Sequence, residues 1–547
     1  MKNDEPCSFR AISQGDIRGW VREDICHLLP PPFFEDPVSS SRAVDARVIK
    51  ESRLRWAGII SLPNGTRIFL KRDKGKGWFE YFKYCVLPSR GRKEWLTASQ
   101  LEERNVNIPK PLGWMERRGQ GLVKESYYIS EAVGSGVPCI EDAVELTNRA
   151  TIIELAKAVR KIHDEGLFHK DFHAGNFLWH GQSFVLTDLH GAKIVRRVSL
   201  NRKLWMMSHL FHSLRSRWAK EHETQFLEAY FEGETPSDHK KEEYLQTIHL
   251  WMDRLQRRQW RSRTKRCLKE STEFTIEKER GAVYYHRRDF PLDRLRRVVQ
   301  EHRRVVREEP SALLKNSTHV ALSMVKTGKE KICVKQFSYP TLWGRLKECF
   351  RREKGLKAWV AANGLRARGM TGLELLAFVK RKRWLGAREG LLMMEVLESG
   401  QELDRYLVKG FDDFRRKRRF INAFAQWLSQ LHKKGIYHQD MKTCNIWVSE
   451  KEGDWGYTLL DLEDVVLDET VDEKKFFRTC LQLNTSIPNR ITRMDRLRFL
   501  RQYLMVRPVP LETREWVKRM TEETRKRGIV YVAPWGVVEE GVPPREG

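Results

Sequence analysis

Apolar and polar positions along the chain alternate between strand-like and helix-like spacing, and this succession occurs twice. Between residues 45 and 135, short apolar runs alternate with helical patterns, and the run at 67–70 follows an Asn64-Gly65 turn. A similar run at 331–334 follows a Thr327-Gly328 turn. Each apolar run behind a turn predicts a strand of a hairpin. Downstream of both regions the spacing becomes helical, so we predict an α+β chain with two similar halves.

Each half carries the motif H-x-D-x-x-x-x-N, followed 12 or 16 residues after the Asn by an aspartate that ends an apolar run. A carboxylate can orient a hydroxyl group, and amide and carboxylate oxygens can bind Mg²⁺, so this set is typical of a kinase site. We therefore predict Asp171 and Asp440 as catalytic bases. The predicted metal ligands are Asn176 and Asp188 in the first half, and Asn445 and Asp461 in the second half.

A kinase site also needs a lysine that holds the nucleotide phosphates. Lys71 and Lys335 each stand at the end of a predicted strand, and Glu94 lies in a predicted helix from which it can pair with Lys71. In the second half Ala358 takes the place of this glutamate, and Glu353, more than a turn upstream, is the alternative acid. The matched positions of the two halves are 264 to 273 residues apart, which an internal duplication explains.

The loop that covers the phosphates has no recognisable glycine motif in either half. We expect the corresponding hairpins near residues 52–58 and 316–320, and neither contains G-x-G-x-x-G. This argues against an ordinary eukaryotic-type protein kinase and leaves divergent kinases open. For the motif histidines, His169 and His438, we favour a structural role in the loop over a role in proton transfer.

A chain of 547 residues, 40% of them hydrophobic, is long enough for two domains of about 250 residues. The nine cysteines are scattered, the N-terminus is charged, and no apolar run reaches the roughly 18 residues of a membrane span, which together favour a cytoplasmic protein. The predicted organisation is a leader at 1–44, a first kinase-like domain at 45–245, a basic junction and the start of the second domain at 246–310, a second kinase-like domain at 311–527, and a tail at 528–547.

The net charge of +28 favours a polyanionic partner. This partner is either the anionic face of a membrane or nucleic acid. Because no nucleic-acid-binding motif is recognisable, the membrane surface is the preferred interpretation.

The two catalytic segments resemble those of the lipopolysaccharide kinase family, the Kdo and heptose kinases of the Gram-negative inner core. The segments at 167–171 and 436–440 each follow a helical pattern that ends in an apolar residue and a histidine. The proline-bearing link at 107–112 and the helical segment at 495–503 are also similar to the family. The resemblance covers roughly residues 45–235 and 310–510.

This resemblance implies a protein-kinase-like bilobal fold, present twice in tandem, with ATP and Mg²⁺ as cofactors. It also implies transfer of a phosphate to a sugar hydroxyl of a lipid-linked core oligosaccharide, at the anionic surface of the inner membrane. Fold and phosphate chemistry do not define the acceptor, so a small-molecule or protein kinase of the same fold is an alternative. The segment His173-Ala174-Gly175-Asn176 is similar to aminoglycoside-type phosphotransferases. A membrane-associated pseudokinase scaffold is a further alternative, which Ala358 supports for the second half only.

Overall fold

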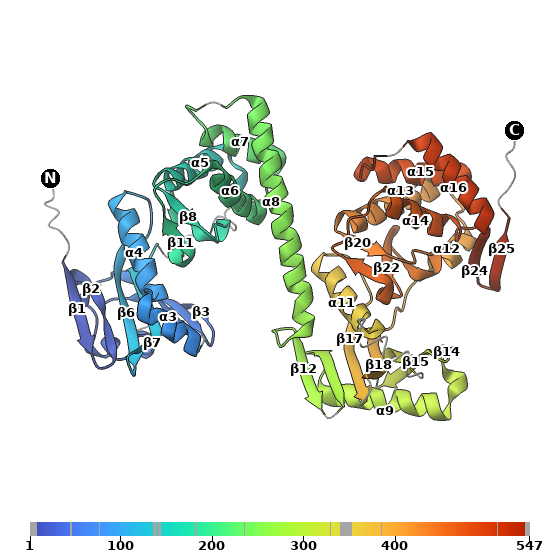
Figure 1. Ribbon diagram of the computed structural model, residues 1–547, viewed down its shortest axis with the longest axis horizontal. Coiled ribbons are helices and arrows are strands. Elements are labelled where there is room, and N and C mark those ends of the chain that lie inside the picture. Colours follow the sequence, from blue (N-terminus) through green and yellow to red (C-terminus); the bar gives the residue numbers. More distant parts are fainter. Residues whose placement is uncertain are drawn as a thin grey trace. The chain divides into compact units, whose positions relative to one another are not determined.

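The computed structural model contains two compact units, residues 1–256 and 257–547, and the boundary lies within helix α8 (Asp238–Thr264). Each unit combines a large antiparallel sheet with a helix-rich part (Figure 1). Within the described part of the chain, no helix has both the length and the apolar character that a membrane span requires. The structure describes residues 8–43, 46–75, 77–134, 139, 144–180, 183–234, 236–279, 281–328, 330–339, 353–383, 386–510 and 512–541.

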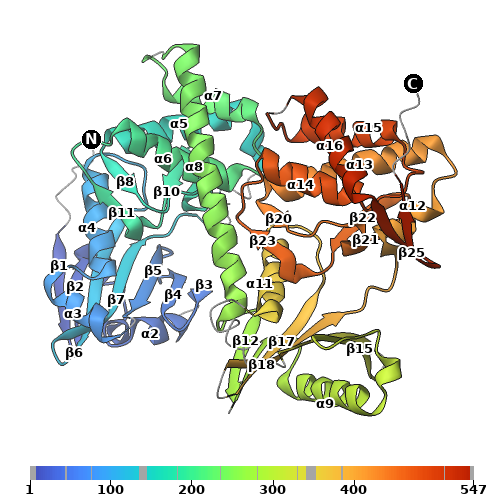
Figure 2. The same cartoon turned by 45° about the vertical axis from the view of Figure 1, so that its right-hand side comes forward.

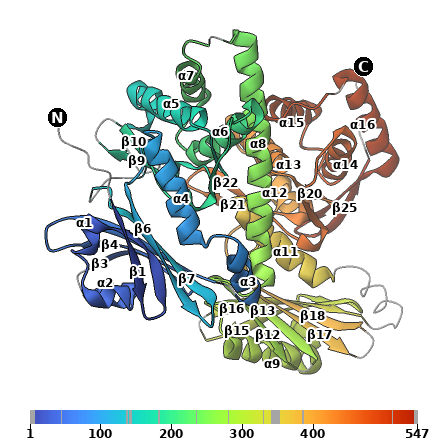
Figure 3. The same cartoon turned by 60° about the vertical axis from the view of Figure 1, so that its left-hand side comes forward.

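The sheet of unit 1 has seven strands in the order β1-β2-β6-β7-β5-β4-β3. Helix α4 (Arg90–Glu103) packs on β6 and β7, an arrangement that Figure 3 shows, and Ser89 caps its N-terminus by accepting a hydrogen bond from the backbone N–H of Arg92. Trp56, Tyr127 and other apolar side chains fill the core of this sheet. The strands are β1 (Phe9–Gln14), β2 (Ile17–Arg22), β3 (Ala46–Glu51), β4 (Arg55–Ser61), β5 (Arg67–Lys74), β6 (Pro111–Gly119) and β7 (Leu122–Glu131).

The helix-rich part of unit 1 has a separate core, in which the helices surround short antiparallel strand pairs. The turns between these short strands carry the H-x-D-x-x-x-x-N motif of the first half, so the helices fix its position. The elements are α5 (Arg149–Asp164), β8 (Leu167–His169), β9 (Phe177–His180), β10 (Ser183–Leu186), β11 (Ala192–Ile194), α6 (Leu200–Leu214) and α7 (Lys220–Tyr230), and α3 (Trp78–Val86) precedes α4.

Unit 2 repeats this plan with seven strands in the order β12-β13-β17-β18-β16-β15-β14, each at the same place as its counterpart in unit 1. The amphipathic helix α9 packs beside β15, as Figure 2 shows, and buries Leu295, Val298 and Val299. The elements of this sheet region are β12 (Phe274–Glu279), β13 (Ala282–Arg287), α9 (Leu292–Glu308), β14 (Lys315–Asn316), β15 (Val320–Thr327), β16 (Glu330–Ser338), α11 (Lys354–Ala367), β17 (Leu375–Arg383) and β18 (Gly386–Glu395).

The helix-rich part of unit 2 again encloses short strand pairs. Its elements are α12 (Leu403–Lys409), α13 (Phe414–Lys433), β20 (Ile436–His438), β21 (Ile446–Lys451), β22 (Asp454–Leu459), β23 (Val465–Leu467), α14 (Glu473–Asn484), α15 (Arg493–Val506), α16 (Thr513–Arg527), β24 (Ile529–Ala533) and β25 (Gly536–Glu540).

Three segments that the sequence places outside the two kinase-like domains, or at their junction, form regular secondary structure. The predicted leader contributes β1 and β2 to the sheet of unit 1, because Ile17 and Val21 are fully buried there. The predicted basic junction contributes β12, β13 and α9 to unit 2, where its arginines stand on the outer faces of buried apolar stripes. The predicted tail forms the β24–β25 hairpin, which the Asp404 carboxylate holds by accepting a hydrogen bond from the Val532 N–H (3.1 Å).

A buried histidine–tyrosine pair occurs at the same place in both helix-rich parts. His163 contacts the Tyr230 hydroxyl at 2.9 Å, and His432 contacts the Tyr503 hydroxyl at 2.6 Å. The Nε2 atom of each histidine has no hydrogen-bond partner among the described residues. Burial without a carboxylate partner lowers the pKa of both rings to about 3, because a charged ring would lose its hydration.

We predict that this pair makes the protein acid-labile. Folded His163 stays neutral down to about pH 3, whereas the ordinary pKa is 6.5, so only the unfolded chain takes up the proton between these values. The free energy of unfolding therefore decreases as the pH falls below 6.5, by about 2 kcal/mol per histidine between pH 7 and pH 5. Urea titrations at both pH values measure this loss. The loss should shrink by about 2 kcal/mol in His163→Gln and persist in the exposed control His180→Gln; the same loss in all three proteins would contradict the prediction.

Candidate active site

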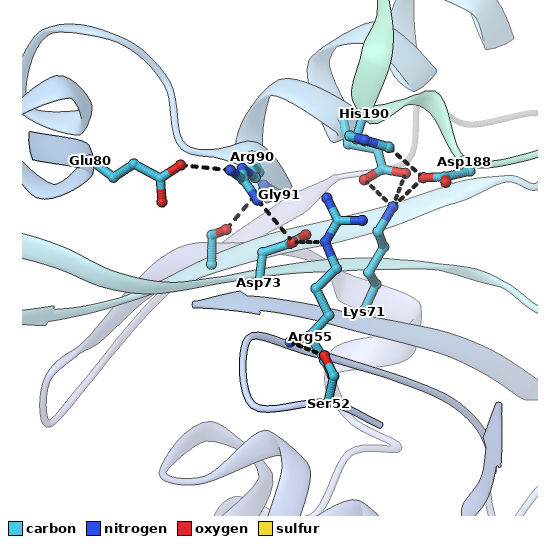
Figure 4. Close-up of polar contacts among 11 residues, drawn as sticks. Ser52, Arg55, Lys71, Asp73, Glu80, Arg90, Gly91, Asp188 and His190 are labelled. Carbon is cyan, nitrogen blue, oxygen red and sulfur yellow. Dashed lines mark hydrogen bonds and ion pairs between the residues drawn. The ribbon is translucent and has the colours of Figure 1, made fainter. Parts of the chain in front are cut away.

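The site of unit 1 is organised around Lys71. The sequence pattern predicted this lysine at the end of a strand, but it lies within β5. Its ammonium donates hydrogen bonds to Glu94 Oε1 (3.1 Å) and Oε2 (3.0 Å) and contacts the Asp188 carboxylate (Figure 4). Lys71 comes from the sheet, Glu94 from α4 and Asp188 from the turn after β10. The structure thus brings together three predicted residues that lie far apart in the sequence.

Burial and charge act against each other on this lysine. Burial favours the neutral amine, but the carboxylates of Glu94 and Asp188 outweigh it and raise the pKa of Lys71. Burial likewise opposes the charge on Asp188, but His190, whose Nδ1 lies 2.7 Å from Asp188 Oδ1, and Lys71 lower the pKa of this carboxyl. Both groups therefore stay charged at neutral pH.

The predicted catalytic segment of unit 1 is held by the motif residues themselves. The Asn176 amide donates a hydrogen bond to the backbone carbonyl of Asp171 (2.7 Å). His169 is fully buried, and its Nδ1 accepts from the Asp171 N–H (3.0 Å) while its Nε2 lies 2.9 Å from the Asp188 carbonyl oxygen. The Asp171 carboxylate is exposed, and His173 Nε2 lies 3.9 Å from it. His169 therefore takes the structural position that the sequence predicts.

Asp188 and Asp461 share an uncommon backbone conformation. Their φ angles are 57° and 44°, in the left-handed region that L-residues other than Asn, Asp and Gly rarely adopt. Such strain is held by the surrounding structure and concentrates at functional turns. Its occurrence at the same place in both units supports a shared role for this turn.

The hairpins predicted to cover the phosphates lie where the sequence places them. In unit 1 the Ser52 N–H donates to the Arg55 carbonyl (2.8 Å), and in unit 2 the Ser317 N–H donates to the Val320 carbonyl (2.9 Å). Each serine hydroxyl also accepts the opposing backbone N–H. A serine-capped turn thus closes these hairpins without a glycine motif.

A charged network supports the hairpin of unit 1. The buried Asp73, two residues after Lys71 on β5, accepts hydrogen bonds from Arg55 Nε (2.8 Å) and Arg90 Nη1 (3.5 Å), and Arg90 also donates to Glu80 (2.6 Å) (Figure 4). The sequence motifs did not indicate these residues. The alternation of Lys71 and Asp73 on one face of a strand was the available signal.

In unit 2 the lysine has a different set of acids. Lys335, within β16, donates hydrogen bonds to Asp461 Oδ1 (2.7 Å) and Glu463 Oε1 (2.8 Å). Burial lowers the pKa of Lys335, but Glu463 and Asp461 outweigh that effect and raise it. Both acids belong to the turn after β22, so this lysine is not tied to the helix α11.

Glu353, the alternative acid considered from the sequence, pairs elsewhere. Its carboxylate lies 3.0 Å from Lys380 Nζ on β17, and Ala358 is fully buried in the core. Glu463 takes the position that His190 has in unit 1, at an offset of 273 residues. Loss of the helix acid in unit 2 is therefore accompanied by a gain of an acid in the turn, which the motif comparison missed.

The catalytic segment of unit 2 matches that of unit 1. The Asn445 amide donates to the Asp440 carbonyl (2.8 Å), and His438 accepts from the Asp440 N–H (3.2 Å). Lys442 Nζ lies 3.1 Å from Asp440 Oδ1, where unit 1 has His173. The two segments share backbone geometry and differ in the side chain beside the carboxylate, which is a histidine in unit 1 and a lysine in unit 2.

Comparisons with known proteins agree with this duplication. The model of the lipopolysaccharide kinase (Kdo/WaaP) family matches residues 42–230 and 341–503. A curated relative, the lipopolysaccharide core heptose(I) kinase WaaP of Escherichia coli (strain K12), is 27% identical over 184 residues, which are 30% of this chain and 69% of the relative. A solved structure of WaaP in complex with acyl carrier protein aligns with 17% identity and a TM-score of 0.30, over 39% of this chain and 87% of that chain.

We predict that Glu463 stabilises unit 2 through Lys335. Glu463→Gln removes a carboxylate from a largely buried ammonium and should decrease the free energy of unfolding by about 1–2 kcal/mol. Asp464→Asn is the matched control, because it removes the same charge from the next residue, whose carboxylate has no contact with Lys335. This control should change the free energy by less than about 0.5 kcal/mol. Equal urea-unfolding energies for the two variants would contradict the role of Glu463.

Proposed function

Because the chain belongs to the lipopolysaccharide kinase (Kdo/WaaP) family, we propose that it transfers the γ-phosphate of ATP to a sugar hydroxyl of the lipopolysaccharide core. The observation that carries this proposal is the buried Lys71, which joins Glu94 on a helix and Asp188 on the turn beside the catalytic segment. These contacts support a site in which Lys71 binds the phosphates, the nearby Asp171 carboxylate binds the hydroxyl group, and Asp188 and Asn176 offer oxygens to the metal.

The predicted residues receive the following roles in this proposal. Asp171 accepts the proton of the sugar hydroxyl while the hydroxyl oxygen forms a bond to the γ-phosphorus, and the bond from that phosphorus to the leaving diphosphate oxygen breaks. Lys71 holds the nucleotide phosphates, and Glu94 keeps its ammonium in place. If unit 2 also transfers phosphate, Asp440 and Lys335 take the corresponding roles.

The residues of both sites fit Mg²⁺ by their donor chemistry. Asn176 and Asp188 in unit 1, like Asn445 and Asp461 in unit 2, offer the amide and carboxylate oxygens that this ion prefers. Asp188 already contacts one cation, the Lys71 ammonium, and its pKa is lowered, which supports it as a cation ligand. When bound, Mg²⁺ neutralises the charge that develops on the phosphates.

We further propose that each unit is a bilobal kinase-like domain. The order of the seven strands is the same in both units, and each sheet is followed by a helix-rich part with the catalytic segment between short strands. The predicted domain limits, 45–245 and 311–527, would then need to widen to include β1 and β2 at one edge of the first sheet and β12 and β13 at the same edge of the second.

The two units differ in how their lysines are fixed, and this difference supports a second candidate role for unit 2. Lys71 is bound between the sheet, α4 and the turn, whereas Lys335 is bound by the turn alone. A kinase in which the helix acid does not reach the lysine lacks the ion pair that positions the lysine for the phosphates. Unit 2 therefore acts either as a second, differently tuned kinase or as a pseudokinase support for unit 1.

The proposed place of action is the cytoplasmic face of the inner membrane. The net charge of +28 favours binding to an anionic lipid surface, and a lipid-linked acceptor would be presented there. Such peripheral binding would decrease as the salt concentration rises, because salt screens charges at the surface.

We predict that Asp171→Asn abolishes transfer by unit 1. Asn preserves the size of the side chain but cannot accept the hydroxyl proton, so the rate should decrease by at least about 100-fold. The measurement is transfer of labelled γ-phosphate from ATP with Mg²⁺ to purified core lipopolysaccharide, and the exposed Asp253→Asn serves as the control.

Asp440→Asn, measured in parallel, separates the two roles of unit 2. Loss of label with Asp171→Asn alone would assign unit 2 a supporting role, and loss with either variant would indicate coupled sites. Unchanged transfer in the Asp171→Asn/Asp440→Asn double variant would contradict the proposed function. Soluble sugars and protein acceptors, tested beside the lipopolysaccharide, distinguish the alternative kinase substrates.

A further inference from the structure

Four exposed lysines of unit 1 have no anionic partner among the described residues. Lys83 belongs to α3, Lys93 to α4, Lys170 to the turn after β8, and Lys193 to β11. Other cations of unit 1, such as Lys71 and Arg90, are paired with carboxylates. Unpaired surface lysines usually lie apart from one another in solvent. A group of them therefore requires an explanation.

The fold brings the segments that carry these lysines together. β11 pairs with β8, and the Lys170 N–H donates a hydrogen bond to the Gly191 carbonyl (3.3 Å), so Lys170, directly after β8, lies beside the segment that leads into β11 and carries Lys193. Helix α4 packs against β11 and against the turn that begins at Leu189. The first turn of this helix carries Lys93.

An aromatic ring fixes part of the group. Lys193 Nζ lies 5.6 Å from the centre of the Phe168 ring, and the Arg202 guanidinium lies 5.4 Å from the same ring. A cation–π contact holds each charge without neutralising it. The ring therefore gathers positive charge from β11 and α6 beside Lys170.

The electrostatics of Lys93 agree with this grouping. Burial and the repulsion of Lys170, Lys83 and Lys193 lower the pKa of Lys93, and no carboxylate contributes an opposing effect. Positive charges that lie close together without a counterion create a positive potential that attracts anions.

Unit 2 shows that the fold itself does not require these charges. The position of Lys170 is Gln439 in unit 2, at the offset of the catalytic motif, and the position of Lys193 is Val466, at the offset of the metal-binding turn. Val466 pairs with Tyr437 in the same register as Lys193 with Phe168. The strands pair equally well without the lysines, so the lysines serve another purpose.

We propose that Lys93, Lys170 and Lys193 form a binding site for a phosphate group, separate from the site of transfer, and that Lys83 adds to the positive charge around it. Ammonium groups on flexible stems bind phosphate as point charges from several directions, and several converging ammonium groups match the double negative charge of a phosphate monoester. The source of the phosphate is either free phosphate or the headgroup of a phosphorylated lipid.

The position of this site gives it a role in ordering the transfer site. Lys93 directly precedes Glu94, and Lys170 directly precedes Asp171. A phosphate that bridges these two lysines links α4 to the catalytic segment, so its binding favours the arrangement in which Lys71 and Asp171 face the same site. This role is absent from unit 2, where Gln439 and Val466 replace two of the four lysines.

Binding of inorganic phosphate to the full chain tests the proposal without any need for turnover. Titration calorimetry at constant ionic strength compares the wild type with K170Q/K193Q and with the control K50Q/K124Q, which removes two exposed lysines elsewhere on unit 1. The site predicts saturable binding that weakens at least about tenfold in K170Q/K193Q and stays unchanged in K50Q/K124Q.

Flotation with phosphatidylcholine vesicles, with and without phosphatidic acid, distinguishes the two sources of phosphate. Binding only to the vesicles that contain phosphatidic acid, lost in K170Q/K193Q alone, would support the site and assign it to a lipid headgroup. Binding that K170Q/K193Q leaves unchanged, equal weakening in both variants, or no binding to either probe would overturn the proposal.

Discussion

The arrangement of each unit depends on one buried ammonium group that must not be left without a carboxylate. Lys71 and Lys335 stand inside the central strands of their sheets, where an unpaired charge would be strongly destabilising. Each is neutralised by an aspartate, Asp188 or Asp461, from a strained turn of the helix-rich part. This contact connects the sheet of each unit to its catalytic segment and keeps both groups charged.

The second acid around each lysine shows how the duplicated sites have diverged. In unit 1 it is Glu94, which also connects the lysine to α4, and His190 stabilises the aspartate. In unit 2 the helix has Ala358 and the turn has gained Glu463, so the charge is balanced but the connection to the helix is lost. The divergence also reaches the surface, because two of the unpaired lysines beside the first site, Lys170 and Lys193, have the uncharged counterparts Gln439 and Val466 in the second. Both lysines thus have two carboxylate partners, but the contact between the lysine and the helix, and the positive charge of the nearby surface, differ between the units.

Much of this site follows from the sequence, because its members belong to motifs with fixed spacing. The loop geometry around Asp171 and Asp440 depends on local hydrogen bonds that H-x-D-x-x-x-x-N specifies by itself. The pairing of Lys335 with Glu463 does not follow, because it depends on which of several nearby acids the backbone directs at the lysine. A left-handed aspartate two residues earlier sets that direction, and no pattern in the sequence marks it.

The fold could be predicted in outline for similar reasons. Apolar runs behind clear turns, such as β5 after Gly65, gave the inner strands and the two-fold repeat. The edge strands were missed, because β1 and β12 are short and expose one face, so their patterns resemble those of polar loops. Their place in the sheets is decided by pairing with β2 and β13, which is a tertiary interaction that local propensity does not contain.

The central claim is that each unit holds nucleotide phosphates through its buried lysine. The most direct test is the number of ATP molecules that one chain binds in the presence of Mg²⁺, measured by equilibrium dialysis for the wild type, Lys71→Ala and Lys335→Ala. Two molecules per chain in the wild type, and one fewer in each variant, are the predicted result. A chain that binds no nucleotide, or a number that neither substitution changes, would contradict the account.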